Sequence, residues 1–172
     1  MTAGDLPKIR TTEQIMTINV GDTLPNITLS TNGASGPEPL ETGDFFKGKR
    51  VVMFAVPGAF TPGCSNTHMP GFVVQADAIL EKADVIACLA VNDAFVLDAW
   101  QQEQNADNIT MLADGNGDFV KALGLDMDAS GFFMGQRSKR FALIANDGVV
   151  EYLGVDDKGV HKSSADSVLD AL

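Results

Sequence analysis

The sequence has little cysteine and no long apolar run. Only two cysteines, Cys64 and Cys88, occur among its 172 residues. That number is too small for a secreted disulfide framework, and there is no Cys-x-x-Cys pair to act as a dithiol exchanger. The longest apolar runs, at 51–56 and 85–91, are far shorter than the ~20 residues of a membrane-spanning helix, and the N-terminus lacks the apolar core of a signal peptide. We therefore expect a cytoplasmic protein.

Basic residues are also scarce. Lysine and arginine number 12 against 23 aspartates and glutamates, which gives a net charge of −11 at pH 7. Such a surface repels phosphate backbones and anionic lipids, so we expect neither nucleic acid nor a membrane as a partner. The hydrophobic fraction of 45% and the length suit one globular domain. We place this domain at residues 16–172, after a polar, flexible leader at residues 1–15.

The apolar pattern predicts strands alternating with helices. A Val-rich run at 50–56, bounded by Pro57-Gly58, indicates a buried central strand. Apolar residues then recur in steps of three and four, which predicts a helix ending near Lys82. Similar patterns predict an edge strand at 23–30, a turn at 31–39, strands at 84–91 and 109–114, a hairpin at Asp147-Gly148, and a last helix capped by Ser163 or Ser164. This order predicts an α/β fold with a mixed central sheet flanked by helices.

The loop after the strand at 50–56 is the candidate site, because reactive groups in such sheets lie at the carboxyl ends of strands. Pro62 has a φ angle suited to the first turn of a helix, which places Cys64 in that turn. Unpaired backbone N–H groups and the positive end of the helix dipole stabilise a thiolate there. The Thr61 hydroxyl can reach the sulfur. A lone cysteine is also often a small buried hydrophobe, so spacing alone favours reactivity only slightly.

Residues 57–72, PGAFTPGCSNTHMPGF, closely resemble the active-site signature of the peroxiredoxins, which are thiol peroxidases with a thioredoxin-like fold. Pro57, Thr61 and Cys64 meet the PxxxTxxC pattern. The form PGAFTPGC followed by THxPGF is particular to the fifth (type II) subgroup. The resemblance continues through ACLAVNDAFVLDAW, MLADGNGDF and QRSKRFALIANDG, and so covers the chain from about residue 16 to its end.

The resemblance implies a role for each loop residue. Cys64 would be the peroxidatic cysteine, which attacks the O–O bond of hydrogen peroxide or an alkyl hydroperoxide and becomes a sulfenic acid. Thr61 would hydrogen-bond the thiolate and the peroxide, and Pro57 would shield the sulfenic acid. The backbone N–H groups of Gly63 and Cys64 would hold the peroxide oxygens. No cofactor or metal is implied.

The family also uses an arginine from a distant strand, which would stabilise the thiolate and the charge on the leaving oxygen. Arg140 matches that position, and Arg137 is the near competitor. His68 lies four residues after Cys64 and so on the same helix face, where we favour a hydrogen-bonded structural role over that of a base. We expect aromatic side chains to serve packing or subunit contacts rather than substrate binding: Phe60, Phe95 and Trp100.

Cys88 lies in an apolar strand, which raises the pKa of a thiol and favours a structural role. Some members of the subgroup resolve the sulfenic acid with a cysteine near this position, so a resolving role stays open. Others use a cysteine near the C-terminus, and residues 159–167 have none. We expect a one-cysteine cycle, reset by glutathione, glutaredoxin or thioredoxin, in a homodimer.

Two alternatives differ in class. A redox-sensing or chaperone-like protein could use the same sulfenic switch, but it would not need the full set of Thr61, Cys64 and Arg140. A disulfide oxidoreductase would need a second thiol near Cys64, which the loop lacks.

Overall fold

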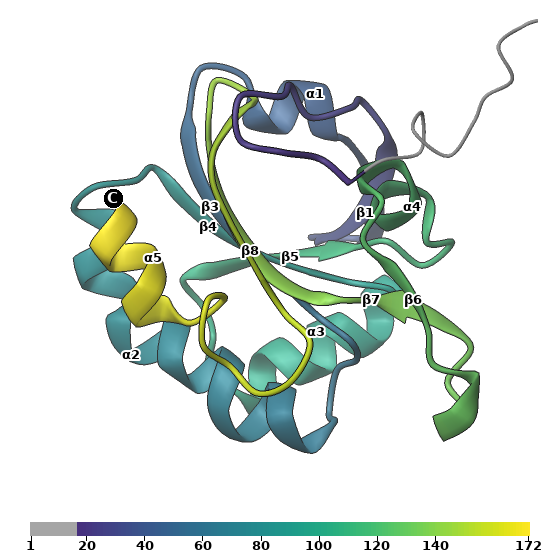
Figure 1. Ribbon diagram of the computed structural model, residues 1–172. Helices are drawn as coiled ribbons and strands as arrows, with labels where there is room; N and C mark the ends of the chain where they lie inside the picture. The colour runs from purple at the N-terminus through teal and green to yellow at the C-terminus, as the bar shows by residue number, and fades with distance from the viewer. Residues whose placement is uncertain (1–16) are drawn as a thin grey trace, which may run out of the picture.

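The computed structural model describes residues 17–172, so the leader predicted at 1–15 and the first residue of the predicted domain lie outside the described residues. A seven-stranded sheet forms the centre, in the order β2-β1-β5-β4-β3-β8-β9 (Figure 1). Three central strands are parallel: β3 (Arg50–Val56), β4 (Val85–Ala90) and β5 (Ile109–Ala113). The others pair antiparallel: β1 (Thr28–Gly33), β2 (Gly36–Glu41), β8 (Arg140–Asn146) and β9 (Val149–Asp156). The predicted mixed sheet is confirmed.

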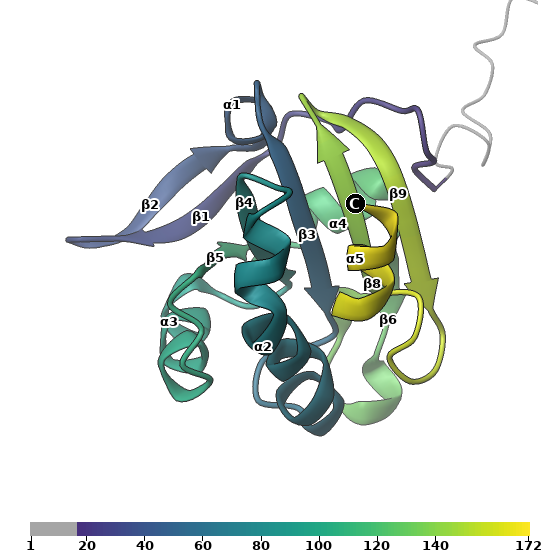
Figure 2. The same cartoon turned by 90° about the vertical axis from the view of Figure 1, so that its left-hand side faces the viewer.

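Helices cover both faces of the sheet (Figures 1 and 2). On one face lie α2 (Met69–Leu80), α3 (Ala94–Glu103) and α5 (Ala165–Ala171), and on the other α1 (Thr42–Phe46) and α4 (Asp118–Leu123). Alternate side chains of β3 therefore enter two separate cores, with Phe54 in the first and Met53 in the second. Because both faces are buried, β3 is apolar along nearly its whole length. No helix within residues 17–172 is long and apolar enough to cross a membrane.

The first hairpin differs from the sequence prediction. Residues 31–39 are not a continuous turn, because β1 extends to Gly33 and pairs with β2 from Gly36 onward. Pro37 and Pro39 lie in β2, which is an edge strand, so their missing N–H groups break no bond within the sheet. A second small sheet, formed by β6 (Asp126–Asp128) and β7 (Gln136–Ser138), was not predicted either.

The second hairpin places a distant segment next to the candidate site. Asp147 and Gly148 both have positive φ angles, 51° and 80°, as a tight turn between β8 and β9 requires. The strand β8 then runs antiparallel to β3, with Phe141 opposite Ala55. The first residue of β8, Arg140, therefore lies beside the carboxyl end of β3, where the loop with Cys64 begins.

Candidate active site

The helix that carries Cys64 begins at Pro62 and contains a π-helical turn, Cys64–His68, before α2. Pro70 causes an irregularity here, because it has no N–H and its ring hinders the usual bond to the residue four positions earlier. The N–H of Met69 donates to the carbonyl of Cys64, five residues back. Turns of this kind are frequent at functional sites. In this one the two buried side chains are those of Cys64 and His68.

The structure brings Arg140, and not Arg137, to the sulfur. Arg140 Nη2 donates to Cys64 Sγ at 3.2 Å. Arg137 instead donates to two backbone carbonyls, those of Met134 at 2.9 Å and Val91 at 3.0 Å. This contact places the positive charge of the guanidinium directly beside the sulfur. A Cβ at Gly63 would lie 3.1 Å from Arg140 Nη2, so a larger residue there would crowd the cation.

Hydrogen bonds hold the loop between β3 and the helix. The Thr61 hydroxyl donates to the carbonyl of Gly58 at 2.6 Å, so its predicted bonds to the thiolate and the peroxide stay predictions. Pro57 is half-buried at the start of the loop. The N–H of Ala59 donates to the side-chain oxygen of Asn92 at 3.0 Å. Sequence reasoning missed Asn92, which follows β4 and so lies at the same edge of the sheet; that placement was the available signal.

Both cysteines are free and fully buried, and both belong to the core that packs against α2 and α3. Burial raises the pKa of Cys88 well above its ordinary value, and the neighbouring Cys64 raises it further, while Arg140 opposes both effects. A protonated, buried thiol is a poor nucleophile. These properties support the structural role that the sequence predicts for Cys88.

His68 bridges the arginine and a distant loop. Its Nδ1 lies 2.8 Å from Arg140 Nη1, and its Nε2 lies 2.8 Å from the carbonyl oxygen of Ser163. A carbonyl only accepts and a guanidinium only donates, so the ring is neutral, with the proton on Nε2. Burial lowers the pKa of His68 to about 4; the Ser163 carbonyl opposes this shift and Arg140 adds to it. Because its free nitrogen already accepts from Arg140, His68 has the hydrogen-bonded role that we favoured.

The low pKa of His68 predicts that acid destabilises the fold. Between its unfolded pKa of 6.5 and its folded value of about 4, the unfolded chain takes up a proton that the folded chain does not. The free energy of unfolding should therefore decrease as the pH is lowered from 6.5 to about 4, by up to about 3 kcal/mol. Urea unfolding at a series of pH values measures this. The variant His68→Asn should lose that part of the slope, and equal slopes in the two proteins would contradict the prediction.

The predicted aromatic residues fall into two groups. Trp100 is fully buried and its Nε1 donates to the Ser65 hydroxyl at 2.9 Å, so of the two roles predicted for it the structure shows packing. Phe95 is 70% exposed and Phe60 is 52% exposed. Neither of these two rings is packed away within the chain, so a subunit contact stays a prediction for both.

The comparisons with known proteins agree with the geometry. The sequence profile of the Redoxin family matches residues 19–169. Chloroplastic peroxiredoxin-2E of Arabidopsis thaliana is 43% identical over 169 residues, which are 94% of this chain and 72% of that protein. A crystal structure of reduced Prx3 from Vibrio vulnificus in complex with hydrogen peroxide is 50% identical, with a TM-score of 0.87 over 90% of this chain and 99% of that one. Peroxiredoxin 5 from Alvinella pompejana is 33% identical, with a TM-score of 0.78 over 90% and 97% of the two chains. The thioredoxin-like fold is therefore confirmed, and with its cysteine, arginine and loop motif the chain belongs to the peroxiredoxins, a family of thiol peroxidases.

Proposed function

We propose that this chain reduces hydrogen peroxide and alkyl hydroperoxides with Cys64 as the attacking thiolate. The observation that carries the proposal is the contact between Arg140 Nη2 and Cys64 Sγ at 3.2 Å, in the first turns of a helix at the carboxyl end of β3. The V. vulnificus relative crystallised with hydrogen peroxide supports this substrate.

In the proposed reaction the sulfur donates an electron pair to one peroxide oxygen. An S–O bond forms as the O–O bond breaks, Cys64 is oxidised to a sulfenic acid, and the second oxygen leaves as water or an alcohol once it gains a proton. The guanidinium stabilises the negative charge that moves from sulfur to the leaving oxygen. First-turn N–H groups, including those of Gly63 and Cys64, are the proposed donors to the peroxide, and Thr61 and Pro57 complete the pocket.

We propose a one-cysteine cycle for the return to the thiol. A glutathione thiolate would attack the sulfenic sulfur, forming an S–S bond as the S–O bond breaks, and the displaced hydroxide would take up a proton to become water. A second thiolate, from glutathione, glutaredoxin or thioredoxin, would then attack the glutathione sulfur of the mixed disulfide and release Cys64. Because Cys64 is fully buried, reductants of this size can reach it only when the turn at 64–68 opens.

The two free thiols suit a reducing compartment, which supports the cytoplasm as the location.

We further propose a homodimer. Phe60 follows β3, Phe95 follows β4, and the loops after these adjacent parallel strands are joined by the bond from Ala59 to Asn92. Both exposed rings therefore belong to the same edge of the sheet as Cys64. Exposed aromatic residues are enriched where subunits meet, which supports this edge as the interface.

Mass spectrometry after one equivalent of peroxide tests the proposed cycle. We expect a sulfenic acid on Cys64 without glutathione and a glutathione adduct on Cys64 with it. The variant Cys88→Ser should give the same two products and should turn over with the same reductants. A Cys64–Cys88 disulfide, or a Cys88→Ser enzyme that consumes peroxide once and then stops, would show that Cys88 is a resolving cysteine.

A further inference from the structure

The carboxylate at the end of β9 organises the loop that follows it. Asp156 Oδ2 accepts from the N–H groups of His161 and Ser163 and from the Ser163 hydroxyl, at 2.7–2.9 Å, and Oδ1 accepts from the N–H of Lys162 at 3.1 Å. Asp156 as a whole is only 8% exposed. Burial alone would raise the pKa of Asp156, but these hydrogen bonds lower it to about 2. The loop is therefore built on a carboxylate that stays charged at neutral pH.

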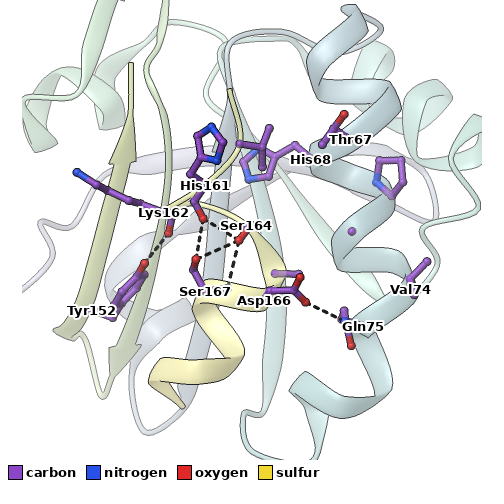
Figure 3. A pocket seen from close by; sticks show the side chains of 14 residues that line it. Thr67, His68, Val74, Gln75, Tyr152, His161, Lys162, Ser164, Asp166 and Ser167 are labelled. Carbon is purple, nitrogen blue, oxygen red and sulfur yellow. Dashed lines mark hydrogen bonds between the residues drawn. The ribbon is translucent and has the colours of Figure 1, made fainter. Parts of the chain in front are cut away.

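Three successive carbonyls of this loop are also held by side chains, and Figure 3 shows the bonds to the first two, those of His161 and Lys162. The carbonyl of His161 accepts from the hydroxyls of Ser164 and Ser167, each at 2.7 Å, and that of Lys162 accepts from the Tyr152 hydroxyl. The third, that of Ser163, accepts from His68 Nε2 at 2.8 Å, across 95 positions of the sequence. The N–H groups of the loop donate to Asp156, and its carbonyls accept from side chains. These hydrogen bonds hold the Ser163 carbonyl in a fixed direction.

The chain of contacts continues to the sulfur. His68 Nδ1 accepts from Arg140 Nη1 at 2.8 Å, and Arg140 Nη2 donates to Cys64 Sγ at 3.2 Å. The guanidinium is planar and rigid, so holding one terminal nitrogen sets the direction of the other. The His68 ring cannot turn freely, since it is bonded at both nitrogens and packed beside Phe54 and Phe72, with ring centroids 5.0 and 5.6 Å away.

We propose that His68 and Asp156 are positioning residues for the peroxide reaction. Asp156 fixes the loop, the Ser163 carbonyl fixes the His68 ring, and the ring holds Arg140 with one guanidinium nitrogen against Cys64. Neither His68 nor Asp156 touches the peroxide. This inference rests on the proposed peroxidase function, because it assigns the two residues to the orientation of the cation in that reaction.

The first arm of the test compares two replacements of His68, with stopped-flow oxidation of reduced Cys64 by hydrogen peroxide as the measurement. The variant His68→Leu removes the acceptor and should slow oxidation by about 10- to 100-fold, the loss expected for a hydrogen bond to a charged group. The variant His68→Asn can place its amide oxygen near the position of Nδ1 and should recover oxidation to within about threefold of wild type. A merely structural role would lower the melting temperature in both variants without this order of rates.

The second arm stays informative if His68→Leu does not fold. The variant Asp156→Asn removes the negative charge and replaces one accepting oxygen with an NH2 group, so at least the bond from the Lys162 N–H is lost. It should slow oxidation by about tenfold. Its matched control is Asp157→Asn, at the next, exposed position, which should match wild type. The positioning roles are overturned if Asp156→Asn also matches wild type, or if the folded Leu and Asn variants at position 68 react equally fast. A wild-type protein that reacts no faster than free glutathione would instead overturn the peroxidase function, and this inference with it.

Discussion

Replacing Cys64 by serine should reduce peroxide consumption to the level of buffer. The serine hydroxyl is nearly the same size, so the buried turn at 64–68 should keep its fold, but the hydroxyl does not ionise at neutral pH as a thiol can. The loss of hydrogen peroxide over time, with dithiothreitol as reductant, measures this. The control is Cys88→Ser, which should keep wild-type consumption because Arg140 donates to the sulfur of Cys64 and burial raises the pKa of the Cys88 thiol. If Cys64→Ser still consumed peroxide and Cys88→Ser did not, our assignment of the reaction to Cys64 would be wrong.

Removing the charge at position 140 should have the next largest effect. The variant Arg140→Met should slow oxidation of Cys64 by roughly 100- to 1,000-fold, as expected when one charge-stabilising donor is lost from an active site. The variant Arg140→Lys should recover only part of the rate. It keeps the charge, but one ammonium lacks the planar fork that contacts Cys64 and His68 at the same time.

The matched control for this prediction is Arg137→Met, three positions earlier. Arg137 bonds to the carbonyls of Met134 and Val91 and not to the sulfur, so its loss should slow oxidation less than about tenfold. Stopped-flow measurements of the oxidation rate, made over the same series of peroxide concentrations, compare all three variants. Equal losses at positions 137 and 140 would contradict the assignment of Arg140 as the cation of the site.

The acidic surface and the cationic site are compatible. The net charge of −11 repels anions, but hydrogen peroxide and alkyl hydroperoxides are neutral and are not repelled. In the proposed reaction, positive charge is needed only where negative charge develops, beside Cys64, and Arg140 would supply it there. The net negative charge that argues against a nucleic-acid partner therefore does not hinder the binding of a neutral substrate.

Local patterns predicted most of the fold because each carries its own physical cause. The apolar run at 50–56 indicates a strand buried on both faces, and Asp147-Gly148 indicates a tight hairpin turn. The strand β2 was missed because Pro37, Pro39 and nearby glycine are typical of turns, and only its place at the sheet edge makes proline acceptable there. Edge position is a property of the whole sheet and is not written in the local sequence.

Some residues of the candidate site could be predicted from the sequence, and others could not. The loop motif identified Cys64, and its resemblance to a family singled out Arg140 ahead of Arg137, a choice that spacing alone could not make. The contacts that hold His68 against Arg140 could not be predicted. The group that holds His68 is a backbone carbonyl, which every residue has, and it lies 95 positions away at Ser163. The carboxylate of Asp156 acts by ordering that backbone, so nothing in its sequence neighbourhood marks it.

The rate of the first oxidation of reduced wild-type protein by hydrogen peroxide tests the central claim most directly. The single tryptophan, Trp100, donates to Ser65 beside Cys64 and offers a fluorescence signal from the reacting turn. If the helix N–H groups and Arg140 activate the sulfur, the second-order rate constant should exceed that of glutathione at the same pH by at least about a thousandfold, or ~4 kcal/mol of activation free energy. A rate within about tenfold of glutathione would contradict the account and favour a protein that senses peroxide over one that removes it.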